Sequence, residues 1–299
     1  MNPEPRLNRT ITLKDSRSLG FAEVGDPRGR PVIYCHGFPA SRLEAVLVDR
    51  AARRQGARIV APDRPGYGLS DFKPERRMAE WPADVAELAD ALGFGRFSVL
   101  AVSGGAPYGL SLCGALGDRI AAASVVAGLG PVYDPEAVRP MHPPARFGFT
   151  SARYAPWLTW LVYGMWFGPF MRARPELALA LLTTAMGEAD RATLGQPDTR
   201  AVLCESIREA LRPGMRGALL DLDLYSHDWG LDFAGIDLPV VFWHGDADST
   251  VPPSHSLSLA ASLPNARVIQ RPGEGHFSLP INHADEILAA LLNPRTPHA

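Results

Sequence analysis

The sequence has few cysteines, no excess of either charge and no long uninterrupted apolar run. Its three cysteines, Cys35, Cys113 and Cys204, are an odd number at wide spacing, which is typical of reduced core thiols and not of a disulfide framework. The formal net charge of -2 comes from mixed charges without a basic stripe. This pattern disfavours nucleic acid and anionic membrane surfaces as partners, so a small-molecule ligand is the expected partner.

Segments that would mark export or membrane insertion are not visible either. Residues 1–6 are polar and lack the apolar core of a secretory signal. The longest apolar stretch, residues 157–170, is interrupted by threonine, glycine and proline and is too short to span a bilayer. We therefore expect a cytoplasmic protein without a membrane anchor, whose last residues, 293–299, fray.

Patterns that bind metals or dinucleotides are missing as well. The eight histidines are dispersed, no cysteine pair has ligand spacing, and there is no His-Glu-x-x-His run. No glycine-rich dinucleotide fingerprint opens the first buried strand. We expect neither a metal nor a cofactor.

Short apolar runs alternate with helix-like segments over most of the chain, and residues 9–24 alternate in the manner of an edge hairpin. We expect buried strands over 31–35, 57–61, 97–102, 120–127, 239–243 and 266–270. We expect helices over 44–55, 81–92, 106–116, 254–263 and 284–292. Strands and helices in this alternation predict an α/β fold, a mostly parallel twisted sheet with helices on both faces.

The alternation stops between residues 131 and 232, where the sequence becomes helical, aromatic and punctuated by prolines. We therefore predict a core domain of residues 1–130 and 233–299, with a helical cap inserted at 131–232. Any single aromatic residue of the cap is expected to pack the cap against the sheet, but together they predict an apolar roof over a pocket. These residues are Trp157, Trp160, Tyr163, Trp166, Phe167 and Phe170.

The segment around Ser103 predicts a sharp turn from a strand into a helix. Residues 100–107 read Leu-Ala-Val-Ser-Gly-Gly-Ala-Pro, and small neighbours suit the strained backbone at the apex of such a turn. The turn would hold the Ser103 hydroxyl outward and place the Gly104 N–H at a helix N-terminus, where negative charge is favoured. Ala101 stands where this motif usually has a glycine. The same residues also suit an ordinary turn. Whether Ser103 is catalytic therefore depends on finding partner residues elsewhere in the chain.

Distinctive polar clusters follow the other predicted strands. They are His-Gly-Phe-Pro at 36–39, Asp-Arg-Pro-Gly-Tyr-Gly-Leu-Ser at 63–70, His-Gly-Asp-Ala-Asp at 244–248 and Gly-Glu-Gly-His-Phe at 273–277. The carboxyl ends of parallel strands meet at one edge of a sheet, where ligands bind. Together with Ser103, these clusters resemble the alpha/beta hydrolase family over residues 10–292.

The resemblance implies a catalytic triad in the chain order serine, acid, histidine. Ser103 would be the nucleophile, His276 the base that accepts its proton, and Asp248 the carboxylate that orients the imidazole. Asp246 competes with Asp248 for the last role. The family's His-Gly-x-x-Asp pattern selects Asp248, which leaves Asp246 to cap the turn.

Four other histidines compete with His276. His36 and His244 are expected to hydrogen-bond loop backbone around the site, which is the commoner use of a histidine beside an apolar strand. His255 and His283 are the other two. His276 differs from all four because its Gly-Glu-Gly-His segment after a strand matches the family.

The segment at 36–39 resembles the family's turn that contributes to the oxyanion hole. The backbone N–H groups of Phe38 and Gly104 would together bind the developing oxyanion. Gly37 and Pro39 also suit a plain tight turn, and both interpretations can hold at once. The segment at 63–70 resembles a structural motif that holds its loop beside this turn.

These residues predict a cofactor-independent serine hydrolase, a carboxylesterase of small to medium apolar esters that forms an acyl-enzyme at Ser103. Haloalkane dehalogenases and epoxide hydrolases resemble this architecture but use aspartate at the elbow, so Ser103 argues against both. Lactonases, carbon–carbon bond hydrolases, proline iminopeptidases, perhydrolases and hydroxynitrile lyases stay open, because the cap sets the substrate. A ligand-binding or receptor-like protein of low turnover on the same fold is the alternative from another class.

Overall fold

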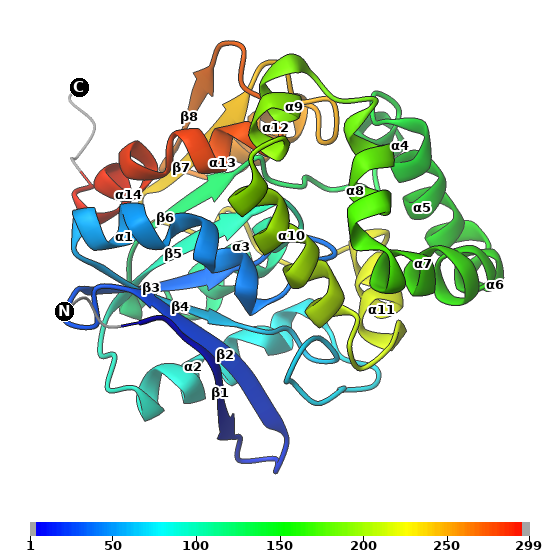
Figure 1. The fold of residues 1–299 in the computed structure, drawn as a ribbon. Helices are drawn as coiled ribbons and strands as arrows, with labels where there is room; N and C mark the ends of the chain where they lie inside the picture. Colours follow the sequence, from blue (N-terminus) through cyan, green and yellow to red (C-terminus); the bar gives the residue numbers. More distant parts are fainter. Residues whose placement is uncertain (1–3, 295–299) are drawn as a thin grey trace.

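The structure is a computed structural model that describes residues 4–294 (Figure 1). Residues 1–3 and 295–299 lie outside the described residues, and with them part of the predicted polar start and most of the predicted frayed end. None of the helices within residues 4–294 is both long and apolar enough to cross a bilayer.

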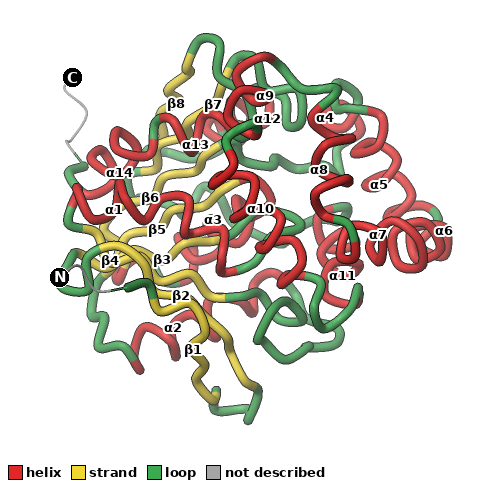
Figure 2. The backbone as a smooth tube through the Cα atoms, in the orientation of Figure 1, coloured by secondary structure: helices red, strands yellow, loops and turns green. Residues whose placement is uncertain are grey.

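Within residues 4–294, eight strands form one sheet in the order β1-β2-β4-β3-β5-β6-β7-β8 (Figure 2). The strands are β1 (Arg6–Thr12), β2 (Ser18–Gly25), β3 (Arg30–Cys35), β4 (Ala57–Pro62), β5 (Phe97–Val102), β6 (Ile120–Val126), β7 (Val240–Gly245) and β8 (Ala266–Arg271). The β1–β2 hairpin lies antiparallel at one edge, and β2 is antiparallel to β4. All remaining neighbours are parallel. The predicted edge hairpin and mostly parallel sheet are confirmed.

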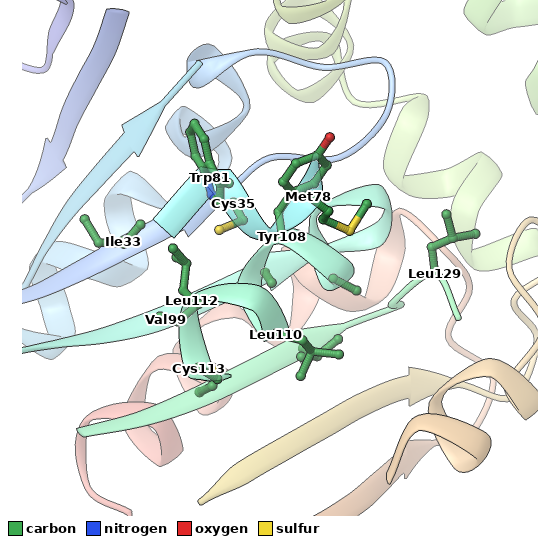
Figure 3. Packing of buried hydrophobic residues seen from close by; sticks show 14 of the residues in the cluster. Ile33, Cys35, Met78, Trp81, Val99, Tyr108, Leu110, Leu112, Cys113 and Leu129 are labelled. Carbon is green, nitrogen blue, oxygen red and sulfur yellow. The ribbon is translucent and has the colours of Figure 1, made fainter. Parts of the chain in front are cut away.

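Both faces of the sheet are buried, because its inner strands carry apolar side chains on both sides. Ile33 of β3 belongs to one apolar cluster, whereas Val32 belongs to a second cluster on the other face. Figure 3 shows the first cluster, in which Trp81 and Tyr108 pack over the sheet. This burial on both sides explains why the strands appear in the sequence as continuous apolar runs. The helices of this core are α1 (Asp49–Gln55), α2 (Trp81–Ala91), α3 (Ala106–Ala115), α12 (Ser254–Ala261), α13 (Ser278–Asn282) and α14 (Ala284–Leu292).

The helix predicted over 44–55 is divided into two segments. A 3-10 helix spans Arg42–Val48, and α1 follows it. The first segment turns Arg42 and Glu44 inward, where Arg42 pairs with the Asp63 carboxylate at 2.8 Å. We attribute the division to such tertiary hydrogen bonds, which outweigh the preference for one regular helix.

Between β6 and β7, the stretch where we predicted a cap, the described chain forms helices and connecting loops but no strand. The helices are α4 (Pro135–Val138), α5 (Pro143–Tyr154), α6 (Pro156–Thr159), a π-helix (Trp160–Phe167), α7 (Gly168–Ala173), α8 (Pro175–Thr183), α9 (Glu188–Leu194), α10 (Pro197–Ala210) and α11 (Arg216–Tyr225). Many of them begin at a proline, which lacks the N–H that a first helical turn leaves unpaired. Figure 1 shows α5, α6 and α7 on the side of the molecule away from both termini, whereas α10 lies nearer the sheet.

The prediction of an aromatic roof is only partly right. Tyr163 and Phe167 do line a cavity beside Ser103. Trp157, Trp160 and Trp166, by contrast, are 69%, 56% and 72% exposed and face solvent. The π-helix winds its apolar residues around all sides, so only some of them can face inward.

Candidate active site

Ser103 lies at the end of β5, in the turn before α3, with a left-handed backbone of φ +52°. The turn needs glycine at the next two positions. A Cβ on Gly105 would lie 2.1 Å from the Cys35 carbonyl oxygen, and one on Gly104 would lie 2.7 Å from Phe38 Cβ. The strained apex that the sequence predicted is therefore present, and the close approach of the neighbouring strand end explains the two glycines.

The alanine at position 101 is accommodated by a glycine one helix away. A Cβ built on Gly109 of α3 would lie 2.6 Å from the Ala101 Cβ, closer than two such atoms can approach. Because Gly109 has no side chain, the methyl group of Ala101 fits between strand and helix. The departure from the usual motif thus leaves the turn intact.

Ser103, His276 and Asp248 come together at the carboxyl ends of three strands. His276 follows β8, and its Nε2 lies 3.0 Å from the Ser103 Oγ. Asp248 follows β7, and its Oδ2 lies 2.8 Å from the His276 Nδ1. These distances are normal hydrogen bonds, and they form one continuous chain from carboxylate to hydroxyl.

The two competing aspartates have different surroundings. Asp248 is buried, and its second oxygen, Oδ1, accepts the backbone N–H groups of Thr250 and Val251 at 2.8 and 2.9 Å. Asp246 is exposed and accepts the backbone N–H of Gly273 at 2.7 Å. The expectation that Asp246 caps its own turn is wrong in detail, because Asp246 ties the two loops together and Asp248 closes the turn.

The charges of the Asp248–His276 pair stabilise each other. Burial disfavours the imidazolium, but the Asp248 carboxylate outweighs it, so the pKa of His276 lies above its ordinary value of 6.5. Burial also opposes ionisation of Asp248, but the charge of His276 and hydrogen bonds from His244 and His276 lower the pKa of Asp248 below 3.8. Asp248 is therefore ionised throughout the neutral range.

The other four candidate histidines have different main hydrogen-bond partners, although His244 also contacts Asp248, with its Nε2 3.3 Å from the Asp248 Oδ2. His36 Nδ1 lies 3.0 Å from the Gly37 carbonyl oxygen, and His244 Nε2 lies 2.8 Å from the Val251 carbonyl oxygen, as expected for loop-holding residues. The His255 ring joins the Gly130 N–H to the Ala137 carbonyl oxygen, and His283 lies between Glu274 and Glu286.

The backbone N–H groups of Phe38 and Gly104 are close neighbours. A Cβ on Gly104 would lie 3.4 Å from the Phe38 nitrogen. Within residues 4–294, the Phe38 N–H has no hydrogen-bond partner, and Gly104 lies in the first turn of its helix, where N–H groups are unpaired. Both predicted donors therefore stand beside Ser103, free to bind an oxygen atom.

Arg64, in the predicted structural segment at 63–70, holds the turn at 36–39, for which the resemblance predicts an oxyanion role. Its guanidinium donates to the carbonyl oxygens of His36 and Gly37 at 2.5 and 2.9 Å. The expectation that this segment supports the turn is confirmed by these contacts.

Two largely apolar cavities share Ser103 and Phe38 in their walls. The first, of about 210 Å³, extends past Leu179 and Phe277. The second, of about 200 Å³, extends under Tyr163. Ser103 therefore borders two spaces of similar size. Within the described residues there is no group of three or more histidine, cysteine or carboxylate side chains that could hold a metal ion.

A family model of the alpha/beta hydrolase fold matches residues 30–282, most of the chain. The chain belongs to the alpha/beta hydrolase fold family. The polar strand ends that carried the resemblance lie inside the matched region.

Relatives of this alpha/beta hydrolase carry several different names. A non-heme haloperoxidase from Rhodococcus erythropolis is 24% identical, over 95% of this chain and 97% of that protein. A bromoperoxidase structure from Bacillus anthracis superposes with a TM-score of 0.71 at 20% identity, over 95% of this chain and 98% of that one. The structure of a thermophilic esterase from Thermogutta terrifontis superposes with a TM-score of 0.66 at 20% identity, over 95% of this chain and 96% of that one. At these identities the likeness of the solved structures shows the fold alone.

Sequence reasoning missed Asp190, which positions the His276 loop of this hydrolase. Asp190 lies in α9, is fully buried, and accepts the backbone N–H groups of His276, Phe277 and Ser278, each at 2.9 Å. No motif marks it, because an aspartate between helix-forming residues looks like an ordinary surface residue. A helix from the stretch between β6 and β7 thus contributes to holding the imidazole.

Sequence reasoning also missed Asp221 of α11, the centre of a buried network behind the turn at 36–39. Its carboxylate accepts from Arg64 Nε and Tyr67 Oη, both at 2.8 Å, and also from Arg76 and Tyr108. Burial opposes its ionisation, but the two arginines lower the pKa of Asp221 below 3.8. The charge of Arg64, which holds the turn, is therefore balanced by this carboxylate.

Replacing Asp221 with alanine is expected to lower the free energy of unfolding by about 3–5 kcal/mol, because Arg64 and Arg76 would stay buried without a counter-charge. Urea unfolding followed by tryptophan fluorescence measures the change. The control is Glu205→Ala, which removes one of the two carboxylates that pair with the exposed Arg208 and should cost less than about 1 kcal/mol. Equal losses in the two variants would contradict the role given to Asp221.

Proposed function

We propose that this alpha/beta hydrolase is a serine carboxylesterase of small to medium, largely apolar esters that works without a cofactor. The observation that carries the proposal is the hydrogen-bonded chain from Asp248 through His276 to Ser103, ending between two apolar cavities. A serine hydroxyl is a weak nucleophile at neutral pH, so it requires a base in this position.

In the proposed mechanism, His276 Nε2 removes the hydroxyl proton while the Ser103 Oγ attacks the ester carbonyl carbon. The Phe38 and Gly104 N–H groups bind the oxygen on which negative charge develops. The imidazolium of His276, stabilised by Asp248, then protonates the leaving alkoxide. Water attacks the acyl-enzyme with His276 again as base, which releases the acid and restores Ser103.

The two cavities support the substrate class. Their walls are mostly apolar, and neither includes a lysine or arginine that would bind an anionic substrate. One cavity would hold the acyl group and the other the alcohol portion, since both open at Ser103. Their size favours short and medium chains over long ones. The proposed partner is therefore a small molecule.

A perhydrolase is the second candidate, because the relative that matches nearly the whole chain is named a haloperoxidase. In that reaction the acyl group on Ser103 would pass to hydrogen peroxide in place of water. Peracid formation by the purified protein, supplied with an ester and peroxide, distinguishes this outcome.

The test is hydrolysis of 4-nitrophenyl esters of increasing acyl length as a function of pH. We expect turnover of short and medium esters, with an acid limb of kcat/KM above pH 6.5. The reason is that only neutral His276 can accept the serine proton, and its raised pKa keeps it protonated to a higher pH than an ordinary histidine. No hydrolysis of any ester, or an acid limb well below 6.5, would contradict the proposal.

A further inference from the structure

One carboxyl group in the wall of the first cavity has no part in the mechanism above. Glu44 lies on the 3-10 helix Arg42–Val48, is 8% exposed and lines the cavity. Its Oε2 accepts two hydrogen bonds, from the Gly37 N–H at 2.7 Å and from the Tyr34 hydroxyl at 3.1 Å. Its Oε1 accepts no hydrogen bond within residues 4–294, and the protein does not fully enclose this atom.

The free oxygen of Glu44 lies close to the nucleophile. A Cβ built on Gly37 would be 3.0 Å from Glu44 Oε1 and 3.5 Å from Ser103 Cβ. The carboxyl oxygen and the serine thus both lie close to the side-chain position of Gly37, where a methyl group would be tightly packed against Oε1. A substrate atom near the reacting carbonyl can reach both.

A purely structural role accounts for only half of this carboxyl group. One oxygen suffices to hold the oxyanion turn, because Oε2 makes both internal hydrogen bonds. Burial of a carboxyl group is costly unless its oxygens find partners. The remaining oxygen is not fully enclosed and is therefore available to a partner from outside the protein, which is water in the free enzyme and a substrate group when substrate is bound.

The surroundings define the chemistry of that partner. The residues that line the first cavity include no lysine or arginine, so Glu44 is its only carboxyl or permanently charged side chain. Burial raises the pKa of Glu44, although hydrogen bonds from Gly37 and Tyr34 oppose the rise. The ionised carboxylate can only accept hydrogen bonds, so its Oε1 suits a donor group and repels a substrate anion.

We propose that Glu44 Oε1 accepts a hydrogen bond from a hydroxyl or amino group of the substrate. This group lies a few bonds from the reacting carbonyl, on the part of the substrate that occupies the first cavity. Glu44 is then a specificity-determining residue. The preferred substrates are hydroxy- or amino-substituted esters, not plain alkyl esters. This inference rests on the proposed function for its substrate class, but the binding site can be tested without turnover.

The kinetic test compares 4-nitrophenyl 3-hydroxybutanoate with the unsubstituted butanoate, in wild type and Glu44→Gln. Glutamine keeps a carbonyl oxygen for Gly37 and Tyr34 but places an N–H donor where Oε1 was. We expect the ratio of kcat/KM values, hydroxy ester over plain ester, to fall about 10- to 100-fold, the usual loss for a hydrogen bond to a charged group. Glu205→Gln, an exposed carboxyl change, should leave the ratio unaltered. An equal ratio in wild type and Glu44→Gln would overturn the inference.

The binding test uses the Ser103→Ala variant and stable amides, measured by calorimetry. The ligands are N-hexyl butanamide and its 3-hydroxy, 3-amino and terminal carboxylate analogues. We expect the hydroxy and amino compounds to bind more tightly than the plain amide, and the carboxylate to bind least. Equal binding, or preference for the carboxylate, overturns the inference even if Glu44→Gln fails to fold. Preference for the donors in a protein that hydrolyses no ester would instead reject the esterase proposal and keep the site.

Discussion

Replacing Ser103 with alanine is expected to lower kcat for an activated ester by at least about 10,000-fold, because the acyl-enzyme can no longer form. The remaining turnover would come from the oxyanion donors and substrate binding alone, which do not depend on the hydroxyl. KM should change little, since the hydroxyl makes no large contact with the cavities.

The loss must come from chemistry and not from misfolding, so Ser103→Ala should have a urea unfolding curve close to that of wild type. A fluorophosphonate probe should label wild type at Ser103 and leave Ser103→Ala unlabelled. The control is Ser124→Ala in the neighbouring strand β6, where a buried hydroxyl has no hydrogen-bond partner within residues 4–294. This variant should keep its stability and its labelling. Labelling of Ser103→Ala at another residue would show that the nucleophile lies elsewhere.

Replacing Asp248 with asparagine is expected to lower kcat by about 10,000-fold, while Asp246→Asn should have little effect. Asparagine keeps an oxygen for Thr250 and Val251, so the turn persists. Its uncharged side chain neither stabilises the imidazolium nor favours the tautomer with a proton on Nδ1.

The same substitution should move the acid limb of kcat/KM. With Asp248 neutral, the burial that disfavours the imidazolium is no longer outweighed, so the pKa of His276 should fall and the acid limb should shift to lower pH. Stopped assays with a sensitive fluorogenic ester can follow the residual activity. If Asp246→Asn proved the more damaging change, the acid of the triad would have been assigned wrongly.

The parts of the site that sequence could predict share a local signal. Ser103, Phe38 and His276 each stand in a short motif just after an apolar strand, and parallel strands deliver such loops to one edge of the sheet. The chain order serine, acid, histidine then indicated which residue would be the nucleophile and which the base. The strands themselves were predictable because burial on both faces leaves continuous apolar runs.

The parts that sequence could not predict depend on contacts between distant segments. Asp190 and Asp221 serve the site through partners 86 and 157 residues away, His276 and Arg64. Nothing in their immediate neighbours separates them from surface aspartates. The prediction that the tryptophans form a roof was wrong for a different reason. A cluster of aromatic residues predicts burial, but a helix in the outer layer can bury only one of its sides.

The sequence by itself determined the sheet, the turn at Ser103 and the order of the polar strand ends, because these follow from local apolar pattern and small residues. Only the tertiary structure decided that Gly109 makes room for Ala101, that Asp190 holds the His276 loop, and that Glu44 turns one oxygen toward the nucleophile. Each of these depends on the distance between atoms of separate elements, which is set by packing and leaves no trace in residue order.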